Sequence, residues 1–389
     1  MKALDTLCRN LMAMAALSLA LLTMEVRAED LSATGKKRWL TIASSQDQDE
    51  AIGIARYYGG QSARVVSSRS GWFAVIAGPV AATSMKQFHA NYGDWPEIPE
   101  DARLSKGENY VATVWLPNDE KLATELTAYA PVKLSDGGIT VAAKLVKDAD
   151  NSLVELAGND GGQALFNMET PSDAYADFGT AIQIAWLDDA SLLPQVIITR
   201  NTGGAHCCVD TIIATGHISG RWKLIETGLL DGDGFRIENV DGKGAAELLS
   251  ADNSFLYAFD SYAASFAPLR ISKLKGETLE DVTAEPKWRS RIAQDLAATE
   301  FLAKLNPELW RSNGFLAAWV ATKIELGQGR DAWAKMLKTY ERNSDFGPLS
   351  CSTGQSIEDC PQENLGLVPF PEALAAHLKE HGYIPVPDG

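Results

Sequence analysis

The stretch RWLTIASSQDQDEAIGIARYYG, residues 38–59, decides the fold of the first part of the chain. Residues 38–44 are rich in β-branched and aromatic side chains, which predicts a strand. Residues 47–59 place apolar side chains at the spacing of one helix face, namely Ala51, Ile54, Ala55 and Tyr58. A strand followed at once by an amphipathic helix indicates an α/β unit.

The segments that follow complete this unit. QSARVVSS (61–68) and GWFAVIAGPV (71–80) read as two strands joined by a tight turn, and TSMKQFHANYG (83–93) reads as a helix with a Thr83/Ser84 cap. NYVATVW (109–115) is expected to be the last strand. The order βαββαβ over residues 36–116 is the split βαβ plan, in which both helices cover one face of a single sheet.

The pattern changes after residue 120. Short strand patterns alternate with Gly, Asp and Asn turns, which predicts an all-β sandwich or propeller-like region over residues 120–285. The expected strands are 139–148, 151–158, 180–189, 194–201, 209–218, 221–228, 245–253, 256–261 and 268–276. Residues 287–389 then show helical spacing, with helices expected at 287–305, 313–326, 330–343 and 370–382. The predicted fold class is therefore multidomain α+β.

The overall charge narrows the classes of partner. Among 389 residues, 51 are acidic and 35 are basic, which gives a formal net charge of −16. Such a field repels phosphate backbones, so we expect no nucleic-acid partner.

The first 28 residues have the layout of a secretory signal peptide. Lys2 and Arg9 form a basic start, an apolar run follows, and the stretch ends in Val-Arg-Ala before Glu29. No later segment offers about 20 uninterrupted apolar residues, so no membrane span is expected after its removal. The predicted location is the periplasm.

Export bears on the cysteines. Without Cys8, four cysteines remain, Cys207, Cys208, Cys351 and Cys360, an even number in an oxidising compartment. Local pairing joins Cys207 to Cys208 and Cys351 to Cys360. Pairings between the middle and the end of the chain stay open at this stage.

The first unit resembles the SPOR (sporulation-related repeat) domain, a family that binds peptidoglycan glycan strands. The resemblance rests on residues 39–44, 51–58, 64–66, 71–75 and the pair Gly78-Pro79. It implies a sheet face that binds glycan by stacking and hydrogen bonding. The alternation of side chains along the strands directs Trp39, Thr41, Trp72, Ala74 and Ile76 to that face.

Peptidoglycan is thus the expected partner, and the candidate glycan-binding residues are Trp39, Thr41, Arg64 and Trp72. The chain departs from the family at Thr41, Ala74 and Ile76, where more polar residues are usual. An apolar face of this kind also fits a contact with another part of the protein or with another envelope protein. A protein-interaction scaffold without glycan binding is therefore one alternative.

The central region resembles an uncharacterised exported bacterial family with FG-GAP/VCBS-like repeats. The pieces that carry this resemblance are TGGAHCC, DGDG, DNSFLYAFDSYAASFAPL and EDVTAEP. Repeats of that type often hold calcium on Asp-rich turns. The candidate ligands here are Asp231, Asp233, Asn239, Asp241 and Glu247, but each turn lacks part of a full ligand set. No cofactor is expected otherwise.

Two further motifs could carry chemistry. TRNTGGAHCCVD (199–210) holds adjacent cysteines whose side chains leave a strand on opposite faces, so a disulfide-locked turn is favoured over a zinc or thiol site. HLKEH (377–381) matches the H-x-x-E-H zinc pattern but also a helix stop. The enzymatic alternative is an envelope hydrolase around His206, Asp231, Asp233 and Asp241. The main prediction is a non-enzymatic peptidoglycan-binding protein of the cell envelope.

Overall fold

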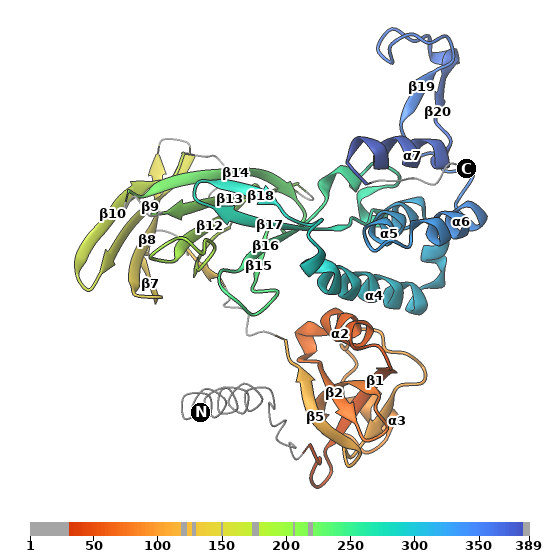
Figure 1. Ribbon diagram of the computed structural model, residues 1–389, viewed down its shortest axis with the longest axis horizontal. Helices are drawn as coiled ribbons and strands as arrows, with labels where there is room; N and C mark the ends of the chain where they lie inside the picture. The colour runs from red at the N-terminus through yellow and green to blue at the C-terminus, as the bar shows by residue number, and fades with distance from the viewer. Residues whose placement is uncertain are drawn as a thin grey trace, which may run out of the picture. The chain divides into compact units, whose positions relative to one another are not determined.

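The computed structural model (Figure 1) describes residues 31–117, 123–126, 130–148, 151–172, 179–204, 207–216 and 221–383. It divides into two units, residues 1–117 and 118–389. Each unit is described by itself below.

The first unit contains the predicted strand, helix and hairpin. Its elements are β1 (Arg38–Ser45), α2 (Gln48–Tyr57), β2 (Arg64–Ser68), β3 (Phe73–Val80), α3 (Met85–Asn91), β4 (Arg103–Ser105) and β5 (Tyr110–Trp115). Asp47 starts α2, because its carboxylate accepts hydrogen bonds from the backbone N–H groups of Asp49 and Glu50 at 2.8 and 3.2 Å. The helix packs on β1, β2 and β3.

The sheet has the antiparallel order β4-β1-β3-β2-β5. The first four positions follow the split βαβ plan. The last strand, predicted at 109–115, is present as β5. The position beside β1 is held by the three residues of β4, a strand that the sequence did not predict, and β5 adds a fifth strand beside β2. Three residues are too short to show a strand pattern in the sequence.

The described part of the second unit holds three larger antiparallel sheets, the two-stranded sheet β19-β20 and the C-terminal helices. Sheet C, in the order β10-β9-β8-β7, consists of β7 (Val132–Asp136), β8 (Ile139–Asp148), β9 (Asn151–Asp160) and β10 (Gln163–Glu169). Sheet B, in the order β14-β13-β12-β11-β6, consists of β6 (Thr124–Glu125), β11 (Thr180–Ala185), β12 (Gln195–Asn201), β13 (Cys207–Thr215) and β14 (Lys223–Asp231). Sheet D, in the order β15-β16-β17-β18, consists of β15 (Arg236–Glu238), β16 (Glu247–Ala251), β17 (Leu269–Lys275) and β18 (Thr278–Asp281).

These sheets stack in layers with the helices. Sheets C and B share one core, in which side chains such as Val141 and Leu156 meet Ile198 and Ile212. The opposite face of sheet B contributes side chains such as Ile197 and Ile213 to a core with Leu248 and Leu274 of sheet D. Sheet B is thus buried on both faces, which explains the nearly continuous apolar runs of β12 and β13.

The other face of sheet D packs on the helices α4 (Arg289–Leu305), α5 (Asn313–Glu325), α6 (Gly329–Thr339) and α7 (Phe370–Glu380). Leu249 and Ile271 of sheet D lie in one core with Trp288, Phe315 and the apolar faces of these helices. Figure 1 shows the sequence of layers from sheet C through sheets B and D to the helices. The sequence predicted an all-β region followed by a helical region. In the structure, sheet D of the first region and the helices of the second share one hydrophobic core.

The propeller-like arrangement is not observed among the described residues, since the sheets stack face to face and none closes into a barrel. The strand expected at 256–261 is also absent. This segment is a turn, with Phe259 buried in the helical core and Tyr257 at a φ of 60°. Of the apolar side chains that suggested a strand, Phe259 packs against Phe370 and His377 of α7, whereas Tyr257 is exposed.

None of the described helices is long and apolar enough to cross a membrane.

Candidate functional site

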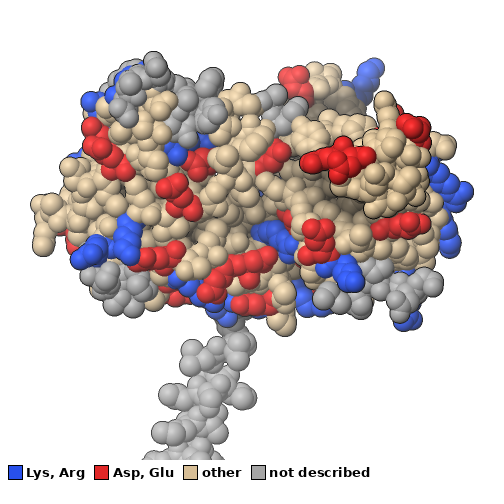
Figure 2. All heavy atoms as spheres, turned by 90° about the horizontal axis from the view of Figure 1, so that it is seen from above, with Lys and Arg blue, Asp and Glu red and all other residues tan. Residues whose placement is uncertain are grey.

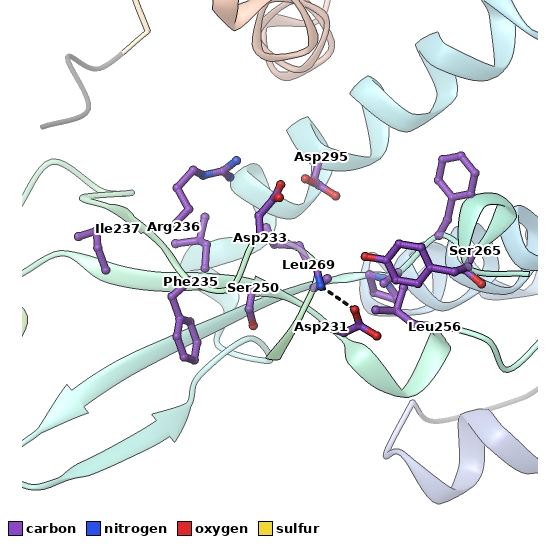
Figure 3. Close-up of a pocket in the computed structure, with 18 of the residues that line it drawn as sticks. Asp231, Asp233, Phe235, Arg236, Ile237, Ser250, Leu256, Ser265, Leu269 and Asp295 are labelled. Atoms are coloured by element: carbon purple, nitrogen blue, oxygen red, sulfur yellow. Dashed lines mark hydrogen bonds between the residues drawn. The ribbon is translucent and has the colours of Figure 1, made fainter. Parts of the chain in front are cut away.

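A pocket of about 640 Å³ opens in the second unit at the junction of sheets B and D with the helices (Figure 3). It is lined by the end of β14, the start of β15, the loop that precedes β17 and the first half of α4. Three carboxylates line it, those of Asp231, Asp233 and Asp295, together with the guanidinium of Arg236 and the ring of Tyr262. We refer to it as the carboxylate pocket.

The turn 231–234 brings two of these carboxylates to the pocket. Gly232 and Gly234 have φ angles of 73° and 69°, a region that favours glycine. A Cβ atom at Gly234 would lie 2.6 Å from Cγ1 of Val209, so this turn lies tightly against β13. The backbone N–H of Gly232 donates to Oδ1 of Asp231 at 2.9 Å, the bond drawn in Figure 3.

A tyrosine pair borders the carboxylates. Burial raises the pKa of Tyr262, and the charge of Asp231, its hydrogen bond to Asp231 and the charge of Asp233 act in the same direction. The ring of Tyr262 lies 5.3 Å from the ring of Tyr257, at an interplanar angle of 39°. Tyr257 is 51% exposed and adopts a left-handed backbone conformation, which is rare outside glycine.

The basic side chains near the pocket are engaged in ion pairs. Nη2 of Arg236 lies 3.5 Å from Glu238, and Nη1 of Arg291 lies 3.7 Å from Asp295 one helical turn along α4. Figure 3 shows the Asp233 and Asp295 side chains pointing into the same space from the turn and from α4. Acidic side chains are also spread over the protein face drawn in Figure 2, in line with the net charge. The pocket therefore offers mainly hydrogen-bond acceptors.

The adjacent cysteines lie one strand away. Cys207 and Cys208 are joined by a disulfide, and Cys207 is the register partner of Asp231 in the pairing of β13 with β14. Thr202 fixes this turn, because its backbone N–H donates to the carbonyl of Cys208 at 2.9 Å. The preference for a disulfide-locked turn over a zinc or thiol site is thus supported. His206, which the hydrolase alternative used, lies outside the described residues.

The second disulfide joins Cys351 to Cys360, as local pairing predicted, with Cα atoms 5.8 Å apart.

The calcium candidates separate into two places. Asp231 and Asp233 line the carboxylate pocket, whereas Asn239, Asp241 and Glu247 belong to the turn that leads into β16. There Asp241 accepts from the backbone of Lys243, and Asn239 donates to the carbonyl of Gly244. Glu247 accepts from the backbone of Val240 and pairs with Lys273. In the described ranges, no three His, Cys, Asp or Glu side chains converge as metal ligands.

Three of the four glycan candidates are covered within their own unit. Trp39 and Thr41 are 6% and 5% exposed, and Trp39 packs with Leu31, Val66 and Ile76. The indole N–H of Trp39 donates to the carbonyl of Leu31 at 2.6 Å, and the Thr41 hydroxyl meets the Tyr110 hydroxyl at 2.6 Å. The half-buried Arg64 lies over the Trp39 ring at 5.3 Å. Only Trp72, at 41%, is exposed.

Of the five side chains predicted to share a face, Trp39, Ala74 and Ile76 lie in one cluster. What covers that face is the segment around Leu31 and Ala33, together with Tyr110. The sequence was compatible with an exposed sheet face and with a face covered by another part of the protein. A flat stacking platform on this sheet is not available while Leu31 and Tyr110 occupy it.

HLKEH lies at the end of α7. Nε2 of His377 lies 3.2 Å from the hydroxyl of Ser254, and its ring lies 4.3 Å from that of His381. Burial and the neighbouring His381 lower the pKa of His377 to about 4. His377 is half-buried, and His381 is the C-cap residue of α7, where its backbone N–H donates to the carbonyl of His377 at 3.0 Å. This geometry fits the helix-stop interpretation.

Sequence reasoning missed Tyr262, Arg236 and Asp295 as pocket residues. They stand on three segments between residues 236 and 295, and only the fold brings them together with Asp231. The local signal was limited to the DGDG turn.

Comparisons with known proteins found one family model that matches the C-terminal part of the chain. Residues 289–382 match the model of the sll0997 C-terminal domain family. The uncharacterized protein y4bJ of Sinorhizobium fredii is 37% identical over 362 residues, which cover 91% of this chain and 57% of that protein. The probable thylakoid lumen protein sll0997 of Synechocystis is 35% identical over 205 residues, 52% of this chain and 60% of that protein.

The chain thus spans less than two thirds of the length of either relative. No solved structure matches it.

These comparisons overturn the resemblance to the SPOR domain and to FG-GAP/VCBS-like repeats. The family model that matches is that of the sll0997 C-terminal domain, and the relatives carry other names. The error has a physical origin. The residues that suggested SPOR, such as 39–44 and 71–75, encode a split βαβ sheet, and unrelated families share that architecture.

Proposed function

We propose that the protein is an exported, non-enzymatic binding protein of the cell envelope, and that its ligand is a glycan strand of peptidoglycan held in the carboxylate pocket. The observation that carries the proposal is the pocket itself, an open cavity lined by the carboxylates of Asp231, Asp233 and Asp295 and by the ring of Tyr262. Sugar rings present hydroxyl donors around an apolar C–H face. Carboxylates and an aromatic ring are the groups that complement them.

Export supports an envelope ligand. Two disulfides fit an oxidising compartment, and the relative from Synechocystis is named a probable thylakoid lumen protein. The periplasm and the cell envelope are proposed on these grounds together with the signal-peptide pattern at the start of the chain.

The pocket supports binding better than catalysis. A hydrolytic site needs a nucleophile or a water with a general base in hydrogen-bond reach. Cys207 and Cys208 are held in a disulfide, and Asp231 is engaged by the Tyr262 hydroxyl. The envelope-hydrolase alternative is included in the experiment below.

The test is co-sedimentation of the purified protein with peptidoglycan sacculi, before and after removal of the stem peptides by an amidase. We expect the wild type to pellet with sacculi. An Asp231→Asn, Asp233→Asn double variant should bind at least about tenfold more weakly, because a hydrogen bond to a charged group contributes about 1.5–3 kcal/mol.

Trp72→Ala is the matched control, because Trp72 is the one exposed member of the N-terminal candidates. It should bind like the wild type. If Trp72→Ala weakens binding and the double variant does not, the binding site lies in the first unit. Failure of the wild type to pellet would leave the scaffold alternative, and release of soluble glycan fragments would show a hydrolase.

A further inference from the structure

A second feature of the molecule has no role in the carboxylate pocket. Residues 345–367 form an arm between α6 and α7, built on the short strands β19 (Leu349–Cys351) and β20 (Leu365–Leu367). Figure 1 shows these strands projecting beyond α7, away from the helical layer. None of the residues 345–367 is buried. The arm therefore contributes nothing to the hydrophobic core.

The arm is nevertheless held in one conformation. Leu349 pairs with Leu367 and Cys351 with Leu365 across the two strands, and the Cys351–Cys360 disulfide closes the tip. An isolated two-stranded hairpin is marginally stable in water, so the covalent bond supplies the order that packing does not. A disulfide in a segment outside the core indicates a role in recognition, because a loop that is ordered before binding loses less conformational entropy when it binds.

The exposed surface of the arm is apolar and acidic. Among the described residues, four of the twelve large hydrophobic side chains that are exposed lie in this short segment, Phe346, Leu349, Ile357 and Leu367. Its charged residues are Asp345, Glu358, Asp359 and Glu363, without any Lys, Arg or His. Exposed apolar side chains concentrated in this way mark an interaction site.

We propose that this arm docks into an apolar groove flanked by lysines and arginines on a partner protein of the same compartment. Charge complementarity selects this occupant. A second copy carries the same acidic arm and the same net charge of −16, so like charges would oppose self-association. An anionic lipid surface would repel the four carboxylates in the same way.

The test is site-specific photo-crosslinking in the cells that make the protein, with p-benzoylphenylalanine in place of Leu349 in the full chain. The same photoreactive residue in place of Leu192, which is 79% exposed and lies outside the arm, is the control. We expect a protein adduct at Leu349 that the control position does not form. Mass spectrometry should map the crosslinked peptide to a groove of the partner that carries basic residues.

A charge-reversed arm, with Glu358→Lys and Asp359→Lys, should reduce the adduct at least about tenfold while the midpoint of thermal unfolding stays unchanged, because neither residue is buried. Replacing both Cys351 and Cys360 by serine should also reduce it. Four results would overturn the proposal: no adduct, an adduct with a second copy, an adduct with lipid, or a yield that charge reversal leaves unchanged.

Discussion

A Lys273→Met variant is expected to unfold with a free energy about 3–5 kcal/mol lower than the wild type at pH 8. Glu247, the first residue of β16, is completely buried, and its carboxylate lies 3.1 Å from Nζ of Lys273. Removing the ammonium leaves a buried charge with the Val240 N–H as its remaining hydrogen-bond donor. Methionine keeps most of the side-chain volume, so the loss reports the ion pair rather than a cavity.

This loss should depend on pH. Burial already raises the pKa of Glu247 against the opposing effect of Lys273. A carboxyl with a raised folded-state pKa is most favourable at low pH, where it is protonated, and becomes costly as pH rises. The Lys273→Met variant should therefore recover part of its stability at pH 5.

Urea unfolding at pH 5 and pH 8 measures both effects. The matched control is the double variant Lys273→Met, Glu247→Gln, in which the neutral amide keeps an acceptor for Val240. It should recover most of the loss at pH 8. A single variant as stable as the wild type at pH 8 would contradict the buried ion pair.

The second large effect concerns Glu325 at the end of α5. Burial raises its pKa to about 8, and among its neighbours Arg270 opposes the rise while Asp252, Asp281 and Asp295 add to it. The nearest cation is Nη1 of Arg270, 3.9 Å from Oε1. Glu325 is therefore mostly protonated in the folded protein at neutral pH.

The direction of the pH effect follows from proton binding. Between the unfolded pKa of 4.5 and the folded pKa of about 8, the folded state binds the extra proton at Glu325, so stability falls as pH rises. His377 has the opposite slope between its folded pKa of about 4 and its unfolded 6.5. The slopes of Glu325 and His377 cancel between about pH 4.5 and 6.5, and above that window His377 no longer offsets Glu325.

We expect the free energy of unfolding to fall by about 2 kcal/mol from pH 6.5 to pH 8, since one pKa unit corresponds to about 1.4 kcal/mol. A Glu325→Gln variant should lose this fall, because the amide resembles the protonated carboxyl and does not titrate. Chemical unfolding over that range measures it. An equal fall in wild type and variant would assign the titration to another group.

Several helices and strands could be predicted from the sequence, because the patterns that indicate them are local. The strand and helix in residues 38–59 are present, and so are the helices predicted after residue 287. The stacking of sheet B between sheets C and D was not predictable, because partner faces are chosen by contacts between segments far apart in the chain. The turn at 256–261 was mistaken for a strand, because a short apolar run does not by its periodicity distinguish a strand from other local structure.

The candidate site was predictable only in fragments. Asp231 and Asp233 stand in a turn that glycines make conspicuous, whereas Asp295 is one of several charged residues on an ordinary helix. At Trp39 the sequence left open either an exposed sheet face or a contact with another part of the protein. The side chains that cover this face, Leu31 and Tyr110, come from segments distant in the chain from β1 and β3.

The layered order of the second unit has a consequence for how it opens. Sheet C shares its described core with sheet B alone, whereas sheet D is enclosed between sheet B and the helices. Such a stack resembles a one-dimensional array, in which each layer is stabilised by its nearest neighbours. Partial unfolding should then start at the outer layer, and backbone amides of β7–β10 should exchange with deuterium sooner than those of β16 and β17. The carboxylate pocket, formed farther along the stack, would keep its shape while the outer sheet frays.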